Sequence, residues 1–230
     1  MSYIEENKRV YNKIAEEFSQ DRQELWGFLK TFKKYVQAGD TILDLGCGNG
    51  RLYQLFDKNQ VDYIGVDQSE ELVKIAKDRC EQARFLVADM LNLPLEDSSV
   101  DVVFCIATFH HLPDRESRLK ALAEMKRTVK QGSKIIMTNW NTNSGWFKDK
   151  VESGDYKQDS EQQDHYIVPF KNENSEIIGE RHYWGIDKQQ IKELSQELDL
   201  EIITNRYINL EGDQVKKEEA MNLLTILNVG

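Results

Sequence analysis

Three glycines stand at every second position after an aspartate in residues 44–50. The four residues are Asp44, Gly46, Gly48 and Gly50, and an apolar, β-prone segment leads into the glycines. A strand followed by a glycine-rich turn and a helix is how a parallel α/β sheet receives a nucleotide-like cofactor, because glycine lets the backbone approach the ligand. The G-x-G-x-G spacing differs from the G-x-G-x-x-G of dinucleotide-binding proteins.

Further polar residues stand at comparable places along the chain. Asp67 ends the apolar run 63–66, and Asp89 follows the run 85–88. Either aspartate alone is more often a helix cap or a turn residue. Their order after successive apolar runs instead favours a shared ligand site, because ligands of parallel α/β sheets bind at the carboxyl ends of the strands. His110 and His111 follow the run 100–107 in the same way.

Strands and helices alternate along most of the chain. This alternation predicts a parallel sheet with helices on both faces. The polar stretch 139–180 interrupts the alternation and predicts a partly mobile segment on the substrate side. We predict one domain, divided into two N-terminal helices (1–40), a cofactor-binding core (41–138), an insert (139–186) and a C-terminal helix with a strand hairpin (187–230). The predicted strands are 41–45, 63–66, 84–87, 100–106, 133–138, 201–207 and 223–229, and the predicted helices of the core and C-terminal region begin near residues 49, 69, 116 and 188.

The sequence D-L-G-C-G-N-G at residues 44–50 resembles the first motif of the class I S-adenosylmethionine (SAM) dependent methyltransferases. Residues 61–69, 85–90 and 100–107 resemble the second to fourth strands of that family, in the same order. The resemblance implies a Rossmann-like class I methyltransferase fold, with a seven-stranded, mostly parallel sheet and an antiparallel last strand. It also implies SAM as the cofactor.

The resemblance further implies which residues bind SAM. In that family the acid of the second strand binds the ribose hydroxyls, which here is Asp67. The acid after the third strand meets the adenine amino group, and the next residue covers the ring. Residues 11–22 resemble a cap helix that closes over the cofactor, although packing alone explains Tyr11 equally well. The expected cofactor-binding residues are Tyr11, Arg22, Asp44, Gly46, Cys47, Gly48, Gly50, Asp67, Gln68, Asp89, Met90 and Ile106.

Residues 106–113, 167–171 and 179–184 are similar to the tRNA wobble-uridine carboxymethyl methyltransferases, which esterify a carboxylate. A carboxylate acceptor needs no general base, whereas a nitrogen or neutral oxygen acceptor can need one. We name His110, His111 and Arg181 as candidate catalytic residues, with Arg181 a natural partner for a carboxylate. Structural packing explains the histidines about equally well. Because Arg181 is followed by H-Y-W instead of the family's Y-Y-H, a small metabolite stays open as the acceptor.

Two other classes of function stay open. A nicotinamide-binding oxidoreductase would also use the glycines and Asp67, although the G-x-G-x-G spacing and Asp89 count against it. A non-catalytic SAM-binding module would keep the same acidic residues. No metal is expected, because His110, His111 and Cys105 lack familiar ligand spacing.

Composition limits the partners of the chain. A net charge of −10 over 230 residues disfavours unaided binding to tRNA, unless the basic residues gather on one face. The resemblance implies that a small activating protein could reconcile this charge with a tRNA substrate. The three cysteines lack framework spacing, and no apolar run has membrane-spanning length. These features predict a cytoplasmic protein without a membrane partner.

Overall fold

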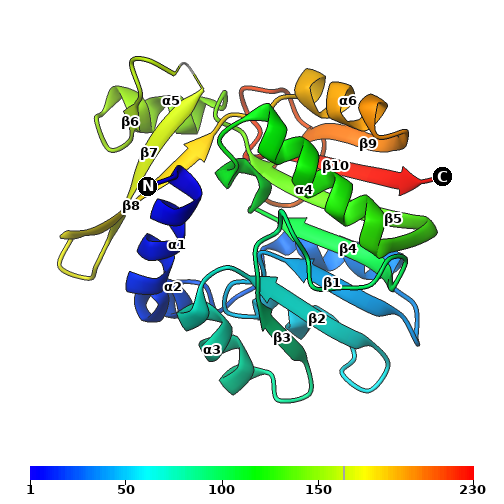
Figure 1. The fold of residues 1–230 in the computed structure, drawn as a ribbon. Helices are drawn as coiled ribbons and strands as arrows, with labels where there is room; N and C mark the ends of the chain where they lie inside the picture. Colours follow the sequence, from blue (N-terminus) through cyan, green and yellow to red (C-terminus); the bar gives the residue numbers. More distant parts are fainter. Residues whose placement is uncertain (163) are drawn as a thin grey trace.

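The computed structural model describes residues 1–162 and 164–230, so only residue 163, inside the predicted insert, lies outside the described residues. Seven strands form the main sheet, in the order β3-β2-β1-β4-β5-β10-β9 (Figure 1). These strands are β1 (Thr41–Leu45), β2 (Asp62–Asp67), β3 (Arg84–Val87), β4 (Val100–Ile106), β5 (Val129–Trp140), β9 (Leu200–Ile208) and β10 (Asn222–Val229).

Strands β1 to β5 pair in parallel, and β10 pairs antiparallel with both β5 and β9. The predicted seven-stranded, mostly parallel sheet with an antiparallel last strand is therefore confirmed. The register places Asp44 opposite Gly65 of β2 and Phe104 of β4. The parallel strands end at one edge of the sheet, so the residues that follow β1, β2 and β4 face the same region.

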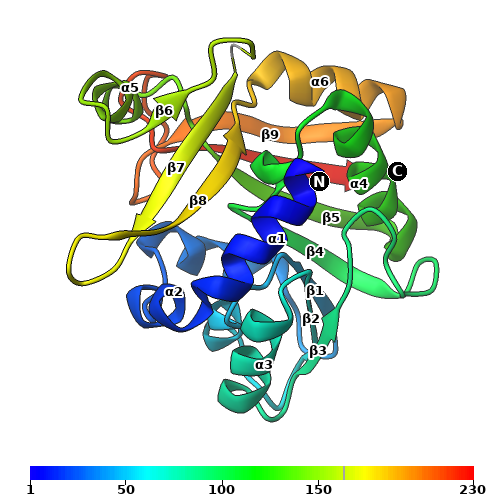
Figure 2. The same ribbon diagram turned by 60° about the vertical axis from the view of Figure 1, so that its left-hand side comes forward.

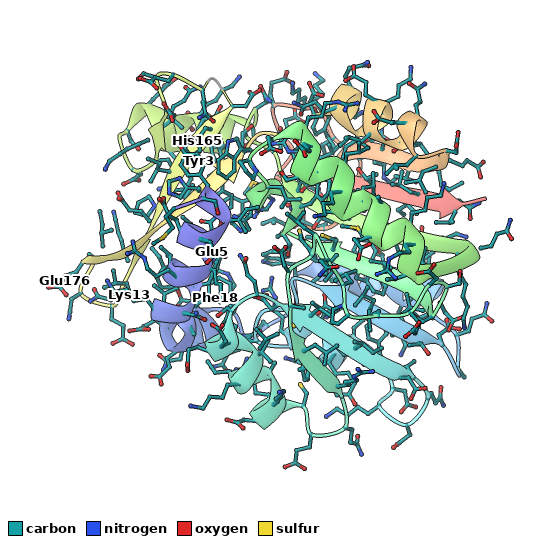
Figure 3. The ribbon with its side chains drawn as sticks, in the orientation of Figure 1. Tyr3, Glu5, Lys13, Phe18, His165 and Glu176 are labelled. Atoms are coloured by element: carbon teal, nitrogen blue, oxygen red, sulfur yellow. The ribbon has the colours of Figure 1, made fainter. Side chains whose placement is uncertain are left out.

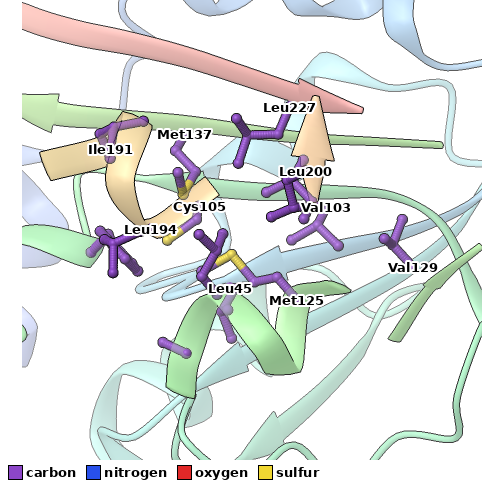
Figure 4. Close-up of a cluster of buried hydrophobic side chains, with 14 of the residues drawn as sticks. Leu45, Val103, Cys105, Met125, Val129, Met137, Ile191, Leu194, Leu200 and Leu227 are labelled. Atoms are coloured by element: carbon purple, nitrogen blue, oxygen red, sulfur yellow. The ribbon is translucent and has the colours of Figure 1, made fainter. Parts of the chain in front are cut away.

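Helices cover both faces of the sheet. The helix α3 (Glu70–Arg79) begins where the Ser69 hydroxyl accepts the Leu72 N–H. The helices α4 (Arg115–Thr128) and α6 (Lys188–Glu197) each begin with an aspartate in a capping box. Side chains of α4 and α6 pack on one face of the sheet (Figure 4), and side chains of α3 and the N-terminal region pack on the other.

The N-terminal region is less α-helical than predicted. It begins with α1 (Tyr3–Lys13) and α2 (Ala15–Asp21), but residues 27–35 form the 3-10 helix η1 (Gly27–Tyr35). The segment after the glycines is likewise a short 3-10 helix, η2 (Arg51–Leu55). Apolar residues three apart suit both helix types, which is why the pattern did not separate them.

The insert is more regular than predicted. It holds α5 (Gly145–Glu152) and a second, antiparallel sheet of β6 (Lys157–Gln158), β7 (His165–Lys171) and β8 (Ile177–Trp184). Phe147, Val168 and Tyr183 form a small core between them. Helix α1 packs against β8 and crosses in front of the main sheet (Figure 2). Among the described residues, no helix combines the length and the apolar character that crossing a membrane requires.

Candidate functional site

A cavity lies at the carboxyl ends of β1, β2 and β4, between these strand ends and helix α1. Its empty volume is about 1220 Å³ with the solvent at its mouth included. Two of the predicted site residues, Gly50 and His110, are not among its lining residues. The predicted residues that do line it are Tyr11, Arg22, Asp44, Gly46, Cys47, Gly48, Asp67, Gln68, Asp89, Met90, Ile106, His111 and Arg181.

The three glycines of the loop have left-handed backbone conformations but different surroundings. A Cβ atom on Gly46 would lie 2.2 Å from the side chain of Thr108. A Cβ on Gly48 would have no neighbour nearer than a ring atom of Phe18 at 3.9 Å, so it would occupy cavity space. A Cβ on Gly50 would lie 3.1 Å from the ring of Phe85 on β3 and 3.2 Å from Ala76 on α3, so its small size serves the packing of both elements on the loop.

Asp67 braces the glycine loop from the end of β2. Its Oδ2 accepts the Gly48 N–H at 2.9 Å, and its Oδ1 accepts the Ser69 N–H at 2.9 Å. Burial raises the pKa of Asp67, while these backbone N–H groups counteract the rise. Each carboxylate oxygen has a further lone pair, so Asp67 can also accept hydrogen bonds from a diol in the cavity.

Asp44 is buried at the end of β1 and accepts a hydrogen bond from the Tyr63 hydroxyl. Burial raises the pKa of Asp44 to about 7, and the bond from Tyr63 counteracts that rise. The carboxyl group is therefore partly ionised at neutral pH. Sequence analysis missed Tyr63, because its place in an apolar strand gave no sign of a polar partner on β1.

The end of the cavity near Asp89 combines this acid with apolar side chains. Asp89 accepts the Leu91 N–H through Oδ1 at 2.9 Å. Met90, Leu112 and Ile4 line this end and pack on the core. A flat ring with an exposed amino group would find apolar walls and an acceptor there.

Two arginines line the cavity beside the glycine loop. The guanidinium of Arg51 lies 4.1 Å from the centre of the Trp26 ring, and Arg22 lines the same cavity. Burial lowers the pKa of Arg51 to about 10, and the charge of Arg22 lowers it further. Arg22 and Arg51 line the cavity together with Asp44, and this mixture of charges suits the zwitterionic end of an amino acid. Arg22 was predicted from the sequence and Arg51 was not, because nothing in the pattern distinguishes Arg51 from a surface arginine.

His111, Trp140, Arg181 and Tyr183 line the side of the cavity where a methyl acceptor would bind, called the acceptor side below. His111 is held there in one tautomer. Its Nδ1 lies 2.9 Å from the His182 carbonyl oxygen and therefore carries the hydrogen. Its Nε2 then accepts from the Tyr11 hydroxyl at 3.0 Å. Burial lowers the pKa of His111 to about 4, so the ring is neutral at pH 7.

His110 lies behind the cavity wall instead of in the cavity. Its ring stacks on Tyr183 at 4.8 Å, and Tyr183 stacks on Trp140 at 4.9 Å. The backbone N–H of Trp140 donates to Nδ1 of His110, and burial lowers the pKa of His110 well below its usual range. The ring of His110 also lies 4.8 Å from that of His111, edge to face. His110 therefore supports the aromatic wall formed by Tyr183 and Trp140.

Arg181 brings a buried positive charge to the cavity. Its side chain is 5% exposed, and its guanidinium lies 5.3 Å from the centre of the Phe170 ring and 5.6 Å from that of Tyr183. Its Nη2 donates to the Pro169 carbonyl oxygen at 3.5 Å, its Nε has no hydrogen-bond partner, and among the described residues no carboxylate forms an ion pair with it. Because buried charges are normally paired, Arg181 is suited to an anionic ligand.

Asn7 is a further residue that sequence analysis missed. It is fully buried on α1, where its Oδ1 accepts the His182 N–H at 2.8 Å and its Nδ2 donates to the His182 carbonyl at 2.9 Å. Tyr3, Asn7 and Tyr11 recur every fourth residue, so they share one helix face. A polar residue between two aromatic residues on the same helix face is the sequence signal by which Asn7 could have been predicted.

Residues 43–137 match a protein family described as a methyltransferase domain. A tRNA (carboxymethyluridine(34)-5-O)-methyltransferase of Arabidopsis thaliana is 39% identical over 132 residues, which are 57% of this chain and 32% of that protein. The enzyme of the same name in Saccharomyces cerevisiae is 33% identical over 137 residues, which are 60% of this chain and 48% of that protein. The chain thus spans about a third to a half of the length of these relatives.

A solved structure shares the fold along nearly the whole chain. It is a Haloferax volcanii methyltransferase in complex with the Trm112 methyltransferase activator, with a TM-score of 0.65 and 20% identity over 95% of this chain and 97% of that one. The predicted fold and family are confirmed by these comparisons and by the strand order of the main sheet. Residues 43–137 therefore match a methyltransferase domain, and the chain has the class I methyltransferase fold.

Proposed function

We propose that this protein transfers the methyl group of SAM to a carboxylate on a modified wobble uridine of tRNA. The observation that carries the proposal is Arg181, a buried guanidinium that lines the cavity and has no carboxylate partner among the described residues. An arginine fork binds a carboxylate through two parallel hydrogen bonds, so it can fix the acceptor oxygen in one orientation.

The lining residues fit SAM group by group. The open space at Gly48 admits the ligand beside the backbone, and Asp67 has lone pairs left for the ribose hydroxyls. Asp44 is the acceptor for the ammonium group. Asp89 and Met90 suit adenine at the apolar end. When bound, SAM supplies an activated methyl group on a positively charged sulfur.

Neither His110 nor His111 is placed to act as a general base, which supports a carboxylate as the methyl acceptor. His111 donates through Nδ1 to a carbonyl and accepts through Nε2 from Tyr11, so both of its nitrogens are engaged. His110 lies outside the cavity lining. An acceptor that must lose a proton would need a base there, whereas a carboxylate is already anionic. The protein then needs only to align the carboxylate oxygen with the methyl group and to exclude water.

The tRNA part of the proposal draws on the two relatives, whose names state a carboxymethyluridine substrate. The aromatic wall of Tyr183 and Trp140 gives a uracil ring a surface on which to stack. Because the net charge of −10 opposes tRNA binding, we include a small activating protein partner in the proposal. A cytoplasmic location also belongs to it, supported by three free, buried cysteines.

A small carboxylate metabolite is the second candidate acceptor. The same aromatic wall and Arg181 would bind it, and the acidic net charge would not oppose it. In that case no activating partner would be needed.

The test is methyl incorporation from labelled SAM into undermodified tRNA and, in parallel, into a small-metabolite extract. Each reaction is run with and without the small activator protein, and with Asp67→Ala protein as the control that loses SAM binding. Alkali-labile label in tRNA supports the proposal. Label confined to the small-molecule fraction supports the second candidate. SAM binding without label in either fraction contradicts both acceptors.

A further inference from the structure

Four titratable side chains form a continuous row where α1 meets the second sheet. Asp159 Oδ2 lies 2.9 Å from Nδ1 of His165, and Nε2 of His165 lies 2.8 Å from Nδ1 of His182. Nε2 of His182 then lies 3.1 Å from Oε2 of Glu6 on α1. Figure 3 shows His165 beside Tyr3 at the N-terminal end of α1, and their ring centres are 4.9 Å apart.

The three contacts of this row need three hydrogens on two imidazole rings. The ionised carboxylates at both ends only accept, so Nδ1 of His165 and Nε2 of His182 must each carry a hydrogen. The two inner nitrogens are 2.8 Å apart and need one hydrogen between them. Two neutral rings hold only two such hydrogens, so one of the three contacts would have no hydrogen and could not be a hydrogen bond. Two imidazolium rings would point N–H against N–H.

The surroundings of the row make an unmade hydrogen bond costly and a second added proton unfavourable. His165 is 1% exposed and stacks on Trp184 at 4.5 Å, so water does not compensate for an unmade hydrogen bond there. Burial lowers the pKa of His182, and the charge of His165 lowers it further, while Glu6 acts in the opposite direction. Burial thus opposes an added proton on His182, the Glu6 carboxylate supports one, and the charge of a protonated His165 opposes a second. The other charged or titratable groups around the row are Tyr3, Arg9 and Lys13 of α1, His111 of η3 (Phe109–His111), Lys157 of β6 and Glu180 of β8.

The row connects helix α1 with strand β8, and both elements contribute to the acceptor side. The backbone of His182 binds both amide atoms of Asn7, and its carbonyl oxygen fixes the tautomer of His111. Its neighbours along β8 are Arg181 and Tyr183, which line the cavity. Since side chains alternate along a strand, His182 points to α1 while these neighbours point to the cavity.

We propose that one proton shared by His165 and His182 fastens α1 to the second sheet. Glu6 and Asp159 complete this bridge, and all four side chains act as positioning residues for the acceptor side of the cavity. The role of the bridge in methyl transfer rests on the proposed function. The proton count does not.

The proton count is tested by nuclear magnetic resonance of protein with ¹⁵N-labelled histidine rings at pH 7. The chain has four histidines, and burial keeps His110 and His111 neutral there by lowering the pKa of each. We expect three ring hydrogens on the pair of His165 and His182, and two after Glu6→Gln. Two ring hydrogens in the unchanged protein would overturn the proposal.

The fastening is tested by hydrogen exchange at the His182 backbone N–H, which donates to Asn7. Glu6→Gln should lower its protection factor about tenfold, because a hydrogen bond between charged groups is lost. Glu5→Gln removes the same charge one residue earlier on α1 and is the matched control. Equal protection in the two variants would contradict the bridge. A second variant, Asp159→Asn, should act like Glu6→Gln from the other end.

The positioning role has a separate readout. With Glu6→Gln, calorimetric affinity for SAM should stay within twofold while the KM for the acceptor rises severalfold. An unchanged KM despite lost protection would overturn the positioning role. If the protein methylates neither acceptor, the proposed function fails, but the ring hydrogens and the exchange of His182 still decide the bridge.

Discussion

The Tyr11 hydroxyl and Nε2 of His111 lie 3.0 Å apart, although the two residues are 100 positions apart in sequence. Nδ1 of His111 carries its hydrogen toward the His182 carbonyl, so Tyr11 is the donor. Burial raises the pKa of Tyr11 well above its usual range, which keeps the proton available. The contact closes α1 over the cavity and orients a neutral imidazole beside Arg181.

Tyr11→Phe should weaken this closure. Nε2 of His111 would lose its donor, and an unsatisfied buried group costs about 1–3 kcal/mol. We expect kcat/KM for the acceptor to fall roughly tenfold or more. Tyr35→Phe, on η1 and outside the cavity lining, is the control for loss of a hydroxyl. Equal kinetics of the two variants would show that the contact has no role in acceptor binding.

Tyr63→Phe should change how SAM affinity depends on pH. Asp44 has a pKa of about 7 and must be ionised to attract an ammonium group, so affinity should fall as pH decreases from 8 to 6. The Tyr63 hydroxyl stabilises the ionised form, so its removal should move this fall to higher pH. At pH 7 we expect an affinity loss of about three- to tenfold, measured by calorimetry.

Tyr53→Phe is the matched control for that measurement. Tyr53 is buried, its ring centre is 4.9 Å from that of Tyr63, and its hydroxyl has no hydrogen-bond partner among the described residues. Its removal should leave the pH profile in place. A profile that Tyr63→Phe does not shift would mean that Asp44 is not the titrating group.

Gly46→Ala should be more harmful than Gly39→Ala. Both glycines have positive φ, so alanine pays about 1–2 kcal/mol for the left-handed conformation at either site. Only at Gly46 does the new Cβ also collide with Thr108, whereas nothing lies within 4 Å at Gly39. We expect a further loss of about 1–3 kcal/mol in the free energy of unfolding, measured by urea denaturation. Equal losses would show that Thr108 moves aside freely.

Arg181→Lys should separate acceptor binding from cofactor binding. Lysine keeps the charge but loses the planar fork, so kcat/KM for a carboxylate acceptor should fall roughly ten- to hundredfold. Affinity for SAM should stay within twofold. Arg206→Lys, on the edge strand β9, is the control, because its Nε also lacks a partner but lies outside the cavity lining. A comparable loss in both variants would argue against an anion site at Arg181.

The cofactor side was predictable from sequence because its signals are local. Asp44 and Asp67 lie at the ends of β1 and β2, and Asp89 lies just after β3. The apolar residues of these strands identify them, and parallel pairing then brings the strand ends to one edge. The limits of this reasoning appear at Gly50. It shares the glycine pattern but does not line the cavity, and its lack of a side chain serves packing against Phe85 and Ala76.

The sequence by itself determined the order of strands and helices, the glycine loop and the acids at the strand ends. Only the tertiary structure decided the acceptor side. Tyr11, Asn7 and Glu6 meet His111, His182 and the second sheet only because α1 packs across β8. Periodicity states which face of a helix is buried but not against which distant strand, since that choice depends on the packing of the whole chain. The shared proton of His165 and His182 belongs to this second kind of information.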